Sequence, residues 1–182
     1  MSVAAMVGGM PVSVAEVDAR ERRLRDSKIA SSLPRPGTSE GRQLRRWLTQ
    51  LLVTERVVTV EAAARGLDAD GAPTEQELLP DTTSRLEIGS ITAAALSQPL
   101  GRALFDDITA AVDVTDEDVA SYQARNPRRF ATATEVAVHL RAASRRRAFR
   151  LWLDARRAAI VELAPGYEHP GDPRQPDNTH RH

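Results

Sequence analysis

The sequence contains no cysteine, and only 4% of its 182 residues are aromatic. Without cysteine the chain cannot form a disulfide framework, a thiolate zinc site or a thiol nucleophile. The scarcity of aromatic residues means that a core must be built mainly from Leu, Val, Ile and Ala, which the 41% hydrophobic content allows. Lysine is also nearly absent, since Lys28 is the only one, and together with the abundance of alanine this composition is typical of a high-GC, actinobacterial-type genome.

Long apolar runs are missing too. No stretch approaches the roughly 20 apolar residues that a membrane-spanning helix needs, and the opening MSVAAMVGGMPVSV lacks the basic and apolar regions of a signal peptide. We therefore expect a cytoplasmic protein with no membrane partner. The G-x-S-x-G, G-x-x-x-x-G-K and G-x-G-x-x-G motifs are absent, so we expect no nucleotide or other cofactor and do not favour an enzyme.

Acidic and basic residues are equal in number, but they are segregated along the chain. Residues 66–120 are predominantly acidic, whereas the segments before and after them are basic. An acidic middle that packs between basic ends is one explanation, and a basic face that meets an acidic partner is the other. A nucleic-acid partner is disfavoured, because no aromatic residues interleave the arginines.

The periodicity of apolar residues predicts a mainly α-helical fold. Ser13 and Glu16 form a capping box at the start of one helix. The longest predicted helix covers residues 39–65 and ends at Gly66. Its apolar residues recur at steps of three and four and are predicted to be buried: Leu44, Trp47, Leu48, Leu51, Leu52, Val58 and Ala62.

Further helices are predicted after Thr74 and Thr115, and two amphipathic segments, 84–98 and 100–112, flank Pro99. The last helix runs from Glu135 to about Ile160, and its predicted buried residues are Val136, Leu140, Phe149, Trp152, Leu153 and Ile160. Short strands at residues 4–10 and 159–164 are expected to pair as a two-stranded sheet from the chain ends. Residues 1–163 are thus predicted to form one helical domain, followed by an extended polar tail over residues 164–182.

Pro170, Pro173 and Pro176 recur every three residues in this tail, which is the period of a polyproline II helix. A disordered polar tail and a tail packed against the body are both compatible with the composition. If the tail is packed, Tyr167 is its expected anchor, and the tail could close a groove between helices.

Three motifs occur in a familiar order: VGGMPVS at residues 7–13, LLVTERVVTVEAAARGL at residues 51–67, and VTDEDVASYQARNPRRF at residues 114–130. They resemble the chaperone domain of SurA-type and related parvulin-associated proteins, and the resemblance covers roughly residues 4–160. It implies a multi-helix scaffold with a binding groove. In that family an isomerase domain follows the third motif, whereas this chain passes from Phe130 almost directly into the last helix. The resemblance therefore does not imply prolyl isomerisation.

The expected function is that of a non-catalytic, chaperone-like or accessory protein that binds a polypeptide or a small hydrophobic ligand in a helical groove. The alternative is a small enzyme, or an accessory protein that meets an acidic acyl carrier protein in specialised, polyketide-type metabolism. In that alternative the tail and the arginine-rich last helix form the site. The predicted ligand-binding residues are Arg141, Arg145, Tyr167, His169, Asp172 and Arg174.

Histidines supply the remaining candidates. His139 follows Glu135 by one helical turn, so it could be a general base oriented by a carboxylate, or simply a histidine packed within the helix. His169, His180 and His182 could bind a metal ion, although their spacing matches no standard ligand set.

Overall fold

The computed structural model describes residues 1–178, and its fold is mainly helical, as the sequence predicts. The chain divides into two compact units. The terminal unit combines Met1–Val60 with the chain from Arg156 onward, and the helical unit is Glu61–Ala155. The predicted division into a helical domain and a separate tail differs from this one, because the tail belongs to the terminal unit. Within residues 1–178, none of the helices combines the length and the apolar character needed to cross a bilayer.

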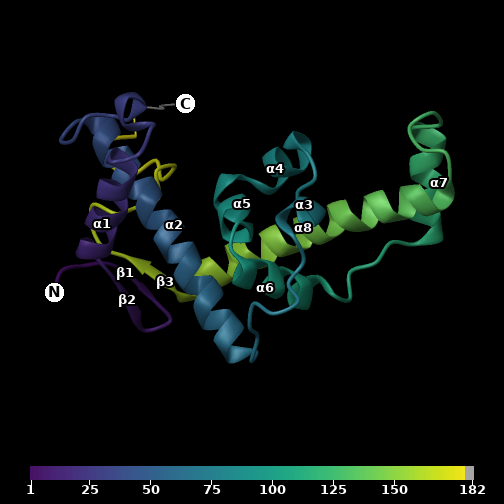
Figure 1. The fold of residues 1–182 in the computed structure, drawn as a ribbon, viewed down its shortest axis with the longest axis horizontal. Helices are drawn as coiled ribbons and strands as arrows, with labels where there is room; N and C mark the ends of the chain where they lie inside the picture. The colour runs from purple at the N-terminus through teal and green to yellow at the C-terminus, as the bar shows by residue number, and fades with distance from the viewer. Residues whose placement is uncertain (179–182) are drawn as a thin grey trace. The chain divides into compact units, whose positions relative to one another are not determined.

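The terminal unit contains a three-stranded antiparallel sheet in the order β2-β1-β3, made of β1 (Val3–Val7), β2 (Met10–Ser13) and β3 (Val161–Leu163) (Figure 1). The predicted pairing of the chain ends is confirmed, since Ala5 lies opposite Leu163. The expectation of only two strands was wrong. Gly8 and Gly9 have φ values of 53° and 82°, the conformation of a two-residue hairpin loop, so the chain turns back into β2.

Helix α1 (Val14–Arg25) begins at the predicted capping box. The Ser13 hydroxyl accepts a hydrogen bond from the Glu16 amide at 3.2 Å, and the Glu16 carboxylate accepts one from the Ser13 amide at 2.7 Å. This reciprocal pair satisfies two amides that a helix start otherwise leaves without partners. It fixes where the second strand ends and the helix begins.

Helix α2 (Ser39–Ala64) starts in the terminal unit and continues into the helical unit. Its buried stripe includes Arg46, Gln50, Val53 and Val57, which follow one another at the helical steps of four, three and four. Trp47 is 37% exposed, so its predicted place in the core was wrong. The apolar pattern misplaced Trp47 because two positions of the true buried stripe are polar.

The helical unit contains α3 (Glu75–Leu78), α4 (Thr82–Ile88), α5 (Ser90–Leu96), α6 (Pro99–Thr109), α7 (Asp116–Arg125) and most of α8 (Ala133–Ile160). Gly89 has a φ of 85° and splits the predicted segment 84–98 into α4 and α5. Pro99 opens α6, as expected for a residue that needs no amide partner at a helix start.

Aromatic rings join α6 to α8 in the core of this unit. The ring centroid of Phe149 lies 5.1 Å from that of Phe105 and 5.7 Å from that of Trp152. Helices α3 to α6 gather along α8, and α7 lies at the N-terminal end of α8 (Figure 1). Three of the seven aromatic residues of the chain thus pack together between these two helices.

Residues 164–178 of the tail form a series of β-turns and not a polyproline II helix. Each of its four prolines is the second residue of a turn, and the closing hydrogen bonds run from the amides of Tyr167, Asp172, Gln175 and Asn178 to the carbonyl groups three residues earlier. The side chains of His169, Asp172 and Gln175 also accept the amide two residues on, at 2.8–2.9 Å. Proline suits both conformations, but a polyproline II helix has no internal hydrogen bonds, and these side-chain acceptors favour the turn.

Phe149 should be the most sensitive position of the helical unit. The Phe149→Ala substitution removes a fully buried ring and is expected to lower the free energy of unfolding by about 3–5 kcal/mol. The matched control is Leu151→Ala on the same helix, because Leu151 is 51% exposed and should change it by about 0.5 kcal/mol or less. Urea denaturation followed by circular dichroism measures both. Equal effects of the two substitutions would contradict this packing.

Candidate anion-binding site

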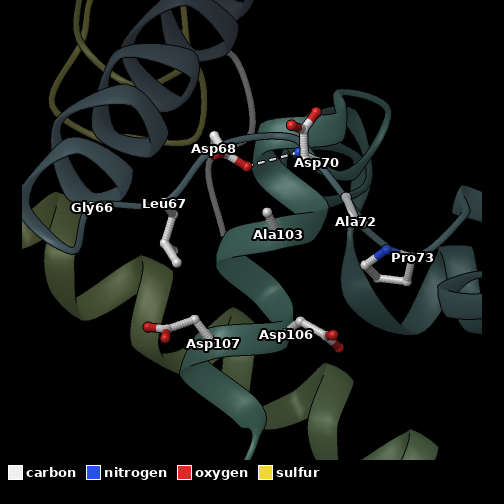
Figure 2. A pocket seen from close by; sticks show the side chains of 10 residues that line it. Gly66, Leu67, Asp68, Asp70, Ala72, Pro73, Ala103, Asp106 and Asp107 are labelled. Carbon is white, nitrogen blue, oxygen red and sulfur yellow. Dashed lines mark hydrogen bonds between the residues drawn. The ribbon is translucent and has the colours of Figure 1, made fainter.

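The helical unit has an acidic pocket of about 410 Å³ between the loop that follows α2 and helix α6 (Figure 2). Its carboxylates come from Asp68, Asp70, Asp106 and Asp107. Two of them are paired with arginines, since Asp106 lies 2.5 Å from Arg145 and Asp107 lies 3.6 Å from Arg65. The Asp68 carboxylate accepts the Asp70 amide at 2.9 Å. No group of three potential metal ligands occurs within residues 1–178, so we assign no metal site to this pocket.

A second pocket of the helical unit is basic and has a volume of about 340 Å³. Helix α4 contributes Glu87 and Ile88, and α8 contributes Ala143, Arg146, Arg147 and Arg150. Ile88 and Ala143 supply an apolar part of the lining, and the three guanidinium groups supply hydrogen-bond donors. We call this cavity the basic pocket.

Arg146 is the residue that distinguishes the basic pocket. It is only 8% exposed, yet its contacts are long. Its Nη1 donates to the Leu78 carbonyl at 3.4 Å, its Nη2 lies 3.8 Å from the Glu87 carboxylate, and its buried Nε has no hydrogen-bond partner. A buried guanidinium normally has its donors satisfied, because an unmet donor costs free energy. Arg146 therefore retains unused capacity to bind an anion.

Arg147 and Arg150 are exposed and line the same cavity. Arg150 makes one long hydrogen bond, from Nη1 to the Glu87 carbonyl at 3.3 Å. Arginine binds carboxylate and phosphate oxygens through two parallel N–H groups, so three guanidinium groups around one cavity can hold and orient such an anion. The arrangement provides binding and orientation of such an anion.

Arg141 and Arg145, the two arginines predicted from the sequence, lie elsewhere on α8. Arg141 donates to the Val112 carbonyl at 3.0 Å, and Arg145 donates to the Thr109 hydroxyl at 2.9 Å. Arg145 also lies over the Phe105 ring, 5.0 Å from its centroid. Arg145 thus contacts α6, and Arg141 contacts the segment that follows α6. Successive residues of a helix point about 100° apart, so Arg145 and Arg146 serve different faces, and the sequence alone did not identify which of them faces a cavity.

His139 lies in a cluster of rings, 5.6 Å from Tyr122 and 5.0 Å from Phe130. Burial lowers the pKa of His139, and the positive charges of Arg129 and Arg146 lower it further, against the opposing charges of Glu87 and Asp81. Glu135 accepts the amides of Ala131 and Thr132 at 2.9 and 3.0 Å. Its carboxylate thus caps the start of α8, and we find no orienting contact between it and His139.

The tail candidates belong to the terminal unit. His169 and Asp172 accept backbone amides within the turns, and Arg174 pairs with Asp172 at 3.0 Å. Burial acts to lower the pKa of Arg45, whereas its interactions with Tyr167, Asp18 and Glu21 raise that pKa above its usual range. Neither unit by itself assembles the predicted combination of tail and last-helix arginines. His180 and His182, the other histidines of the metal hypothesis, lie outside the described residues.

One family matches the chain. Residues 3–40, which comprise the hairpin, α1 and the first residues of α2, match a family of unknown function (DUF7158). No curated protein and no solved structure matches the chain. These findings assign no chemistry to either unit and do not test the resemblance to SurA-type chaperone domains.

Neighbouring arginines of α8 should respond in opposite ways to the same substitution. Arg146→Met removes a buried charge that has only long contacts, so it relieves the cost of burying that charge and loses little hydrogen bonding, and the free energy of unfolding should stay the same or rise. Arg145→Met instead removes the hydrogen bonds to Asp106 and Thr109 and should lower the free energy of unfolding by about 1–2 kcal/mol. Denaturant unfolding compares them. A loss for Arg146→Met as large as that for Arg145→Met would show that Arg146 is structural.

The positive charge of Arg146 should also affect the pKa of His139. Because the folded-state pKa is lowered, stability should fall as the pH decreases from about 6.5, the ordinary histidine pKa, toward the folded value. Arg146→Met removes one of the charges responsible, so the pKa of His139 should rise. Proton NMR of the imidazole measures it, with the exposed Arg125→Gln as control. An unchanged His139 titration in Arg146→Met would contradict this electrostatic coupling.

Proposed function

We propose that the protein is a non-catalytic, chaperone-like or accessory protein whose helical unit binds an acidic group of a polypeptide partner in the basic pocket. The observation that carries this proposal is Arg146, a buried arginine with an unpartnered Nε at the wall of a cavity. A carboxylate is the protein group whose geometry matches such a donor. The pocket volume of about 340 Å³ suits a side chain and its neighbours.

Exposed apolar side chains support a polypeptide as the partner. Leu86 directly precedes the pocket residue Glu87 on α4, and Leu151 directly follows the pocket residue Arg150 on α8. Both leucines are exposed. The two helices that line the pocket therefore also offer exposed apolar side chains to a polypeptide partner. The SurA-type order of motifs points in the same direction, because those domains are peptide-binding scaffolds.

An acidic carrier protein is the second candidate partner, and the exposure of Arg147 and Arg150 favours it. A folded acidic domain would contact these rim charges over a wide surface. Its binding would weaken steeply with salt, because exposed ion pairs are screened at an ionic strength of about 0.15 M and above. A short peptide held at Arg146 would depend less on salt.

The test uses two fluorescent peptides that share one apolar sequence and differ only by two glutamates in place of two glutamines. The glutamate peptide should bind more tightly by about tenfold, which is the effect of roughly one charge-assisted hydrogen bond. Arg147→Gln combined with Arg150→Gln should remove this preference. The control is Arg128→Gln combined with Arg125→Gln, which changes net charge equally at exposed positions outside the pocket. Equal binding of both peptides to the wild-type chain would rule out the proposal.

A further inference from the structure

The terminal unit contains a second set of arginines, and here an acidic group is already bound. Arg42 donates to the two carboxylate oxygens of Asp177 through Nε at 2.8 Å and Nη2 at 2.6 Å. Arg46 donates to Asp177 Oδ2 through Nη1 at 2.6 Å. The Gln43 side chain donates to the Asp177 carbonyl at 3.2 Å. Three residues from the first turns of α2 thus hold one aspartate of the tail.

This contact is a recognition geometry for a carboxylate. Arg42 forms the bidentate pair that gives arginine its specificity for carboxylates, and Arg46 adds a third charge-assisted hydrogen bond. These hydrogen bonds hold the pKa of Asp177 well below its usual range, so the carboxylate stays charged at neutral pH. Gln43 donates to the backbone carbonyl of the bound residue, so the site should prefer a peptide over a free acid.

The turns of the tail are held by hydrogen bonds within the tail itself. Its turns are closed by its own backbone and by the side chains of His169, Asp172 and Gln175. Within residues 164–178 the buried residues are Gln175 and Asp177, and both are polar. Glu168 adds a second acidic contact, 3.5 Å from Arg46. A segment that keeps its shape by internal hydrogen bonds and docks by charge can be exchanged for another acidic segment without unfolding a core.

The buried charge of Arg46 means that the tail can be exchanged only for another segment that carries a negative charge. Arg46 is only 3% exposed, so leaving its charge without a counter-ion would be strongly unfavourable. The site is therefore more stable when filled by an acid than when empty. Release of the tail is favoured only when another acidic segment takes its place.

We propose that Arg42, Gln43 and Arg46 form a binding site for an acidic, turn-forming peptide segment, and that the tail around Asp177 is its resident ligand, displaced by such a segment of a partner. This site lies in the terminal unit, so the proposal does not depend on the basic pocket of the helical unit.

The experiment uses the full-length chain with Asp177→Asn and a fluorescent synthetic peptide of residues 164–178. In the wild-type chain the tail competes at very high effective concentration, so the peptide should bind weakly. Asp177→Asn keeps the size of the residue but removes its charge, so the peptide should bind at least about tenfold more tightly. The same peptide with Asp177→Asn should not bind. Glu162→Gln, an exposed acidic position of β3, is the matched control and should leave peptide binding as weak as in the wild type.

Two further measurements keep the result decisive. Amide hydrogen exchange should show faster exchange of residues 164–178 in Asp177→Asn, with the β1 amides still protected, which demonstrates that the unit remains folded. Arg42→Gln, added to Asp177→Asn, should abolish peptide binding, whereas Arg35→Gln in the same background should not. A tail that stays protected in Asp177→Asn, or one that is released without any gain in peptide binding, would overturn the proposal.

Discussion

Strand β1 is the constraint on which the rest of the terminal unit depends. It is the central strand of the sheet, so it pairs with the hairpin partner β2 on one edge and with β3, from the other end of the chain, on the other. Ala4, Ala5 and Val7 are almost completely buried. The Gly8 amide donates to the Ile160 carbonyl at 2.8 Å, and the Ala164 amide donates to the Ala4 carbonyl at 2.9 Å. These contacts fix where α8 ends and where the tail begins.

Arginine side chains make most of the ion pairs in this nearly lysine-free chain, and the geometry of the guanidinium group explains why. A guanidinium group can donate in several directions from one plane, so one side chain can join a carbonyl, a hydroxyl and a carboxylate. Arg145 uses this capacity within the helical unit, where it contacts Asp106 and Thr109 and lies over the Phe105 ring. A lysine there would lose both the stacking and the fixed direction of the hydrogen bonds.

Much of the fold could be predicted from local rules, and the failures have specific physical causes. The capping boxes at Ser13, Thr74 and Thr115 lie where the sequence places them, because a cap is decided by residues three apart. The second strand was missed although Gly8-Gly9 is a hairpin signal. Trp47 was misplaced because apolar periodicity does not detect a buried stripe that contains Arg46 and Gln50. A run of arginines does not show which member has its hydrogen bonds satisfied, so the sequence could not single out Arg146.

Hydrogen-bond satisfaction is therefore the property that separates the arginines of this protein by role. Arg145 has short contacts with Asp106 and Thr109 of the neighbouring helix α6, so its role is structural. Arg46 is more deeply buried than Arg145, but its short contact reaches Asp177 in a segment with no apolar core of its own, so its partner is exchangeable. Arg46 and Arg146 each have a buried Nε without a hydrogen-bond partner, but the remaining contacts of Arg146 are all long, so its partner is still to be supplied. A buried donor without a partner costs free energy. The hydrogen bonding of Arg145 is the best satisfied and that of Arg146 the least, so Arg146 should gain most from binding an external acid, followed by Arg46.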